Sequence, residues 1–331
     1  MLHRGTNAAQ GLKYAVMERN PENDVAEAAP AATQSAARAA AQRPTGLAPA
    51  QWLAGLEAAA QRVEVPTASG TSVWRRWGAG PPLLLLHGGT GSWRHWVLNL
   101  QALSASYTVW APDMPGYGDS ADAPAGAGPA ELAEGLSQAL DVAIAGDAPV
   151  DLIGFSFGGV VAAHLAARRP DRIRRLMLVG AVGLGALRNA RDQAMQRWRG
   201  LADEQAQRAA HRHNLAVLMI ADPARIDDLA IEIQCQNAAR TRFFSRGASR
   251  GQGLIEALQQ VTLPVCGIWG RHDATSSGGI ETALNAFHQV LPQASSQVID
   301  DAGHWVQYES APACNAAMLD WLAQGAGAPP A

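Results

Sequence analysis

The sequence predicts an α/β fold: a mainly parallel sheet covered by helices on both faces, with a helical segment inserted late in the chain. Short, mostly apolar runs alternate with segments of helical length, a pattern typical of βαβ units. With 48% hydrophobic residues in a chain of 331, a large core can be filled. The runs expected to form the sheet are residues 83–86, 107–111, 150–154, 175–180, 265–270 and 296–299.

The N-terminal part of the chain differs in composition from the rest. Ten of the sixteen residues from 26 to 41 are alanine, without an apolar stripe that could pack on a core, so residues 1–46 are predicted to be a disordered extension. A helix is expected at 49–61. The β-prone runs 62–66 and 71–77, separated by a turn, then predict an antiparallel pair at a sheet edge.

The connection between the runs 175–180 and 265–270 is much longer than the others. We interpret residues 182–262 as an inserted helical cap between a first core part, 47–181, and a second, 263–325, with a flexible tail at 326–331. Asp222-Pro223 is typical of a helix start. Helical spacing within the insertion covers residues 189–199, 203–219, 223–238 and 253–260.

Charge and cysteine content argue against several classes of protein. A net charge of −3 gives no electrostatic reason to expect nucleic acid or a membrane surface as partner, so we expect a small-molecule substrate. The sequence leaves open whether the chain forms a homo-oligomer. The cysteines, Cys235, Cys266 and Cys314, show no paired spacing, and no apolar run is long enough to span a bilayer. Free thiols and a cytoplasmic location are therefore expected.

The strongest functional signal is Gly154-Phe155-Ser156-Phe157-Gly158, between the predicted strand 150–153 and a helical run. This G-x-S-x-G spacing is typical of a nucleophile elbow, a sharp turn that raises a serine hydroxyl above the sheet. It also places Ser156 at a helix N-terminus, where free N–H groups favour a developing oxyanion. The alternative is a glycine-rich turn with an incidental serine.

A serine hydroxyl needs a base and a group that orients the base. Asp273 and His304 each follow the carboxyl end of a predicted strand, where open α/β sheets place reacting groups. Asp300 and Asp301 are too close to His304 along one loop to orient it easily, and His272 is a weaker candidate for the base. We therefore predict catalysis by Ser156, Asp273 and His304.

Other histidines give no sign of a metal site. His211 and His213 share a helical stretch without a nearby carboxylate pair and are interpreted as solvated side chains. We expect neither a metal nor a cofactor. The glycine-rich loop 87–91 lacks the spacing of a phosphate-binding loop, but it can aim a backbone N–H at the oxygen that the Phe157 N–H binds.

Taken together, the segments 87–89, 113–120, 154–158, 270–273 and 303–304 resemble the α/β-hydrolase superfamily over roughly residues 66–322. The resemblance implies Ser156 as nucleophile, Asp273 as acid, His304 as base, and an oxyanion hole formed by the N–H groups of Gly89 and Phe157. It also implies that the inserted cap folds over the pocket.

Residues 303–309 are similar to the meta-cleavage product hydrolases, capped relatives that split carbon–carbon bonds of vinylogous diketone acids. Those enzymes commonly have an asparagine before the nucleophile, where this chain has Phe155, and a longer glycine-rich oxyanion loop. The leading hypothesis is therefore a serine hydrolase of small esters, with carbon–carbon bond hydrolysis second. Transfer of the acyl group to an acceptor other than water and a non-catalytic binding module are further alternatives.

Four residues are candidates for substrate binding. Arg94 or Arg240 could meet a substrate carboxylate, and Phe155 and Trp305 could line an apolar pocket. The alternatives are that Arg94 supports its loop or is solvated and that the aromatic side chains pack in the core.

Overall fold

The computed structural model describes residues 46–184, 194–245, 253–276 and 278–324. The predicted tail at 326–331 and all but the last residue of the predicted extension at 1–46 lie outside these ranges.

The described residues form a central sheet of eight strands in the order β1-β2-β4-β3-β5-β6-β7-β8. β2 pairs antiparallel with β1 and β4, and the strands from β4 to β8 pair in parallel. This confirms the predicted sheet, and each strand begins and ends within two residues of its expected bounds. The strands are β1 (Gln61–Thr67), β2 (Gly70–Trp77), β3 (Pro82–Leu86), β4 (Thr108–Pro112), β5 (Val150–Phe155), β6 (Ile173–Val179), β7 (Val265–Gly270) and β8 (Ser295–Ile299).

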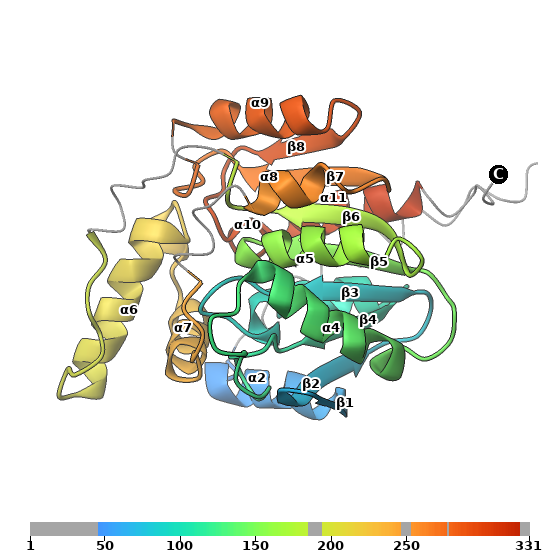
Figure 1. The fold of residues 1–331 in the computed structure, drawn as a ribbon. Helices are drawn as coiled ribbons and strands as arrows, with labels where there is room; N and C mark the ends of the chain where they lie inside the picture. Colours follow the sequence, from blue (N-terminus) through green and yellow to red (C-terminus); the bar gives the residue numbers. More distant parts are fainter. Residues whose placement is uncertain (1–45, 185–193, 246–252, 277, 325–331) are drawn as a thin grey trace, which may run out of the picture.

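Helices cover both faces of the sheet (Figure 1). The neighbours Leu84 and Leu85 on β3 belong to different apolar clusters, because successive side chains of a strand point to opposite faces. α4, α5, α8 and α9 contribute to the cluster of Leu84, and α2, α3 and α11 to that of Leu85. The helices are α2 (Pro49–Ala58), α3 (Leu100–Ser104), α4 (Pro129–Ala143), α5 (Phe157–Arg168), α8 (Gly253–Leu258), α9 (Ile280–Val290) and α11 (Ala311–Ala323).

Two longer helices of the insertion, α6 (Glu204–Leu218) and α7 (Asp228–Ala239), lie to the left of the sheet in Figure 1. The prediction of one helix over 223–238 is wrong. The chain forms a short 3-10 turn, η4 (Pro223–Arg225), before α7 begins. The reason is a second N-cap, since the carboxylate of Asp227 accepts a hydrogen bond from the N–H of Ala230 and starts a new helix.

The predicted helix at 189–199 lies partly outside the described residues, and its residues 195–198 are not helical. The side chain of Asn214 accepts a hydrogen bond from the N–H of Gln196 and donates one to its carbonyl. These backbone groups therefore bond to a side chain of α6 instead of to neighbouring residues in a helix of their own. α8 falls inside the range 182–262 assigned to the cap, but it packs against α5 in the core cluster. By its packing, α8 belongs with the core helices.

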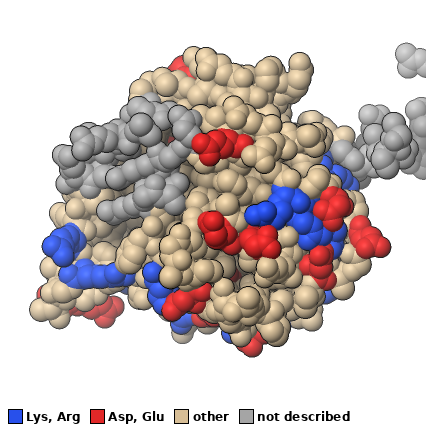
Figure 2. Space-filling model, viewed as in Figure 1, with Lys and Arg blue, Asp and Glu red and all other residues tan. Residues whose placement is uncertain are grey.

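The surface carries mixed charge. Figure 2 shows Arg side chains beside Asp and Glu side chains on the described part of one face. Arg169 and Arg172, for example, both pair with Asp141. No helix in the described ranges is long and apolar enough to cross a membrane.

Candidate active site

Ser156 lies in the tight turn between β5 and α5. Its backbone has φ 53° and ψ −121°, a conformation that is strained for a residue with a side chain. The flanking glycines are required by crowding, because a β-carbon on Gly154 would lie 2.5 Å from the carbonyl oxygen of Gly158, and one on Gly158 would collide with the carbonyl oxygen of His87. The local sequence therefore allows the sharp turn that exposes the Ser156 hydroxyl.

The structure joins Ser156, His304 and Asp273 by hydrogen bonds. The Ser156 Oγ lies 2.8 Å from Nε2 of His304, and Nδ1 of His304 lies 2.9 Å from Oδ2 and 3.0 Å from Oδ1 of Asp273. His304 and Asp273 are buried, and they come from the loops after β8 and β7. Because parallel strands end at one edge of the sheet, residues more than a hundred positions apart in sequence meet there.

The loop after β3 lies against the start of α5. A β-carbon on Gly89 would lie 3.7 Å from Cβ of Phe157 and would collide with the hydroxyl of Ser245. Phe157 is the first residue of α5, and amides in the first turn of a helix have no partner within it. The proposed oxyanion-hole residues Gly89 and Phe157 are thus neighbours beside Ser156.

His95 supports this loop and was not singled out from the sequence. It lies on the 3-10 turn η2 (Trp93–Trp96), and its Nδ1 accepts a hydrogen bond from the N–H of Gly88 at 3.2 Å. Burial lowers the pKa of His95 well below its ordinary value, and the neighbouring His87 and His304 lower it further. Burial also lowers the pKa of His87. Both imidazoles are therefore neutral at neutral pH.

Two residues expected to line the substrate pocket are instead buried in the core. The ring of Phe155 packs against the rings of His304 and His95. Trp305 stacks on Tyr308 and donates a hydrogen bond to the carbonyl of His95. Both are fully buried and present no surface to a substrate: Phe155 packs against His304, and Trp305 packs against His95.

The arginines expected to meet a substrate carboxylate already have carboxylate partners. The buried Arg94 pairs with Glu57 of α2 at 2.9 Å, which favours the interpretation that it supports its loop. The half-exposed Arg240 pairs with Asp119 at 2.6 Å.

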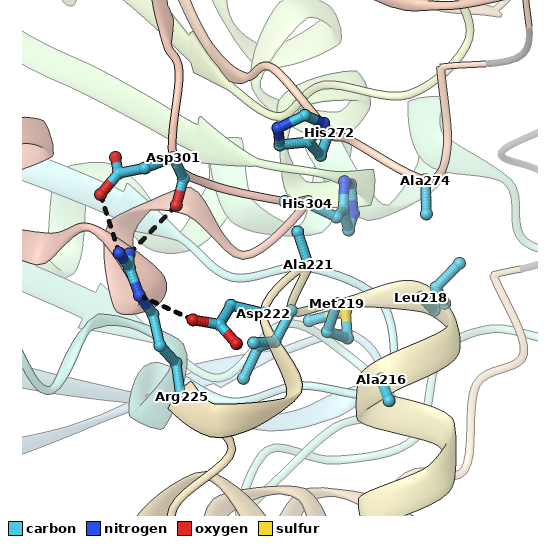
Figure 3. A pocket seen from close by; sticks show the side chains of 12 residues that line it. Ala216, Leu218, Met219, Ala221, Asp222, Arg225, His272, Ala274, Asp301 and His304 are labelled. Atoms are coloured by element: carbon cyan, nitrogen blue, oxygen red, sulfur yellow. Dashed lines mark hydrogen bonds and ion pairs between the residues drawn. The ribbon is translucent and has the colours of Figure 1, made fainter.

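A cavity of about 480 Å³ adjoins His304 on the cap side (Figure 3). The end of α6 and the residues after it form one wall, including Leu218 and Met219. The loops after β7 and β8 form the other, with His272 and Ala274 beside His304. Its volume falls in the range of small-molecule sites, and its walls combine apolar and polar groups.

The other acids considered in the sequence, Asp300 and Asp301, have arginine partners, and Asp301 lines the cavity. Asp300 pairs with Arg271, and Asp301 with Arg225. The interpretation of His211 as solvated is wrong, because it is buried and its ring lies 4.9 Å from that of Trp198. Within the described ranges, no group of three or more His, Cys, Asp or Glu residues could hold a metal ion.

Comparison with known proteins identifies the family. The family described as alpha/beta hydrolase fold matches residues 81–227. The 2-hydroxymuconate semialdehyde hydrolase of Pseudomonas sp. (strain CF600) is 30% identical over 269 residues, which cover 75% of this chain and 88% of that protein. The chain belongs to the α/β hydrolase family.

One further relative of this α/β hydrolase and one solved structure extend the comparison. The dihydrolipoyllysine-residue acetyltransferase component of the acetoin cleaving system of Pseudomonas putida is 33% identical over 73% of the chain, and the matched part spans 64% of that longer protein. The carboxylesterase CesB of Bacillus subtilis shares the fold, with a TM-score of 0.68 at 20% identity, covering 89% of this chain and 99% of that one. The fold and the enzyme class predicted from the sequence are confirmed: the protein is a hydrolase.

Proposed function

We propose that this α/β hydrolase is a serine hydrolase that cleaves a small ester through an acyl-enzyme, with Ser156 as nucleophile, His304 as base and Asp273 as the acid that orients it. The observation that carries the proposal is the continuous set of hydrogen bonds from Ser156 Oγ through both ring nitrogens of His304 to Asp273. A pure binding module would have no need of this arrangement.

In the first half of the reaction, Ser156 Oγ attacks the ester carbonyl carbon and its proton passes to Nε2 of His304. The N–H groups of Gly89 and Phe157 stabilise the negative oxygen of the tetrahedral intermediate. His304 then returns the proton to the leaving alkoxide, so an alcohol departs and the acyl group remains on Ser156. In the second half, water attacks the acyl-enzyme with His304 again as base, which releases the carboxylic acid and restores Ser156.

The charges around the candidate anchors favour a neutral ester as substrate. A dienoate needs a cationic group for its carboxylate, whereas the candidates Arg94 and Arg240 are each paired with a protein carboxylate. Arg242, two residues after Arg240, is paired with Asp122 in the same way. Carbon–carbon bond hydrolysis remains the second candidate, because the 2-hydroxymuconate semialdehyde hydrolase is among the relatives of this chain.

Labelling with an active-site phosphonate tests the mechanism. Ser156→Ala is expected to lose labelling and to reduce turnover of the best substrate by at least about a thousandfold with the fold intact, because triad residues act as a unit. Ser106→Ala, a change at an exposed serine, serves as the matched control and should match the wild type. Wild-type turnover by Ser156→Ala would refute the proposed nucleophile.

Specificity constants for p-nitrophenyl esters and a phenyl-substituted oxo-dienoate distinguish the two substrate classes. We expect the esters to be preferred. A dienoate preference above about a hundredfold, equivalent to about 2.7 kcal/mol of transition-state discrimination, would reverse the ranking.

A further inference from the structure

The carboxylate of Glu309 links the cap to the loop that carries His304. Glu309 ends the short helix α10 (Val306–Glu309) and is buried. Its Oε2 accepts hydrogen bonds from the N–H of Gly303 at 2.7 Å and of Ala221 at 3.0 Å, and its Oε1 accepts one from the N–H of Asp222 at 2.8 Å. Gly303 directly precedes His304, and Ala221 and Asp222 belong to the segment between α6 and η4.

Further contacts tie the same two segments together. The N–H of Trp305, the residue after His304, donates to the carbonyl of Met219 at 2.7 Å. Arg225 bonds both the carbonyl and the carboxylate of Asp301, as the dashed lines in Figure 3 show. The residues on either side of His304 are therefore both attached to the cap.

Gly303 is closely packed against Ala221 of the cap and the Glu309 carboxylate. A β-carbon on Gly303 would lie 2.8 Å from the backbone nitrogen and 3.2 Å from Cβ of Ala221, and 3.2 Å from Oε2 of Glu309. The two backbones and the carboxylate are thus in direct contact. Hydrogen bonds to an ionised acceptor are about twice as strong as neutral ones, so the carboxylate is a strong link between the two segments.

We propose that Glu309 is a positioning residue that holds His304 at hydrogen-bond distance from Ser156. Through Glu309, that distance depends on the position of the cap relative to the loop that carries His304. This inference rests on the proposed function. His304 has to reach both the Ser156 hydroxyl and the leaving oxygen, and a displacement of about 1 Å can cost a hundredfold in rate. Glu309 acts through the backbone of Gly303 and does not itself contact the reacting atoms.

Glu309→Gln tests this role with little change in volume. The amide offers one acceptor oxygen, and its NH₂ group opposes the backbone donors that the carboxylate accepts. We expect kcat on the best ester to fall by about 10- to 100-fold, with KM changed by less than about threefold, at a temperature where the variant is fully folded. The rate of phosphonate labelling of Ser156 should fall in parallel, and Glu309→Asp, which keeps the charge but is shorter, should recover part of both.

Glu131→Gln is the matched control. Glu131 also accepts a backbone hydrogen bond, from the N–H of Gly128 at 2.7 Å, but at the start of α4. This variant should keep wild-type kcat and KM. A folded Glu309→Gln protein with lowered thermal stability but wild-type kcat and labelling rate would overturn the inference, since Glu309 would then serve the fold alone.

If Glu309→Gln cannot be obtained folded, the same criterion applies to Glu309→Asp: a wild-type kcat overturns the inference. Ser156→Ala separates this inference from the proposed function. An inactive Ser156→Ala beside a fully active Glu309→Gln removes only the inference, whereas an active Ser156→Ala removes the proposed function.

Discussion

The hydroxyl of Thr275 donates a hydrogen bond of 2.6 Å to Oδ1 of Asp273, and the N–H of Thr275 donates to the same oxygen at 2.8 Å. The Thr275 hydroxyl also lies 3.2 Å from Nδ1 of His304. The carboxylate that faces His304 is therefore held in place by the residue two positions after it.

Thr275→Val removes the hydroxyl while keeping the shape of the side chain and the backbone N–H. We expect kcat/KM to fall about tenfold, because a hydrogen bond to a charged group contributes about 1.5 kcal/mol or more and fixes the carboxylate that orients His304. Steady-state kinetics on the best ester measure the effect. Thr275→Ser retains the hydroxyl and should stay within about threefold of wild type on the same energy scale. A loss in Thr275→Ser with none in Thr275→Val would show that the methyl group matters instead.

Asp113 anchors a buried network under the loop after β4. It is fully buried, pairs with Arg75 at 3.0 Å and accepts hydrogen bonds from the N–H groups of Trp93 and Asp119. Asp113→Ala should reduce the free energy of unfolding by about 3 kcal/mol, because it leaves buried donors and part of a buried charge without a partner. Urea unfolding at pH 7 measures this loss.

Asp122→Ala is the control for that measurement. Its side chain is 75% exposed and pairs with Arg242 at the surface, so its removal should change the free energy of unfolding by less than about 1 kcal/mol. Equal losses in the two variants would contradict the importance assigned to the buried network.

His211 predicts a pH dependence of stability. Burial and the nearby Arg208 lower the pKa of His211 from the ordinary 6.5 to about 4. The unfolded chain therefore binds more protons than the folded protein between these values, and stability is lost as the pH falls through this window. We expect His211→Phe, which can still stack on Trp198 but cannot titrate, to lose about 1 kcal/mol less than wild type between pH 7 and pH 5.

Thermal unfolding of both proteins at the two pH values checks this prediction. His87 and His95, whose pKa values are also lowered, are present in both proteins, so their contributions cancel in the difference. Identical pH dependence of the two proteins would mean that His211 takes up a proton in the folded state as readily as in the unfolded one.

Signals that extend over a few neighbouring residues were informative in the sequence. The apolar runs predicted the strands, and the spacing around Ser156 predicted the turn that now joins β5 to α5. Asp273 and His304 could be found because each follows a strand, and parallel strands end together. The helix boundaries in the insertion were predicted less well. Helical spacing continues through residues 223–238, whereas the break between η4 and α7 depends on a second N-cap at Asp227.

The sequence by itself determined the α/β class, the order of the strands along the chain and the residues that meet at the carboxyl edge of the sheet, because these follow from local periodicity and chain connectivity. Only the tertiary structure decided that Arg94 pairs with Glu57, that Phe155 and Trp305 are buried in the core, and that Glu309 reaches the cap. The physical reason is that a charge or an aromatic ring acquires its role from the partners that surround it. Those partners come from distant parts of the chain, and only folding brings them within a few ångströms.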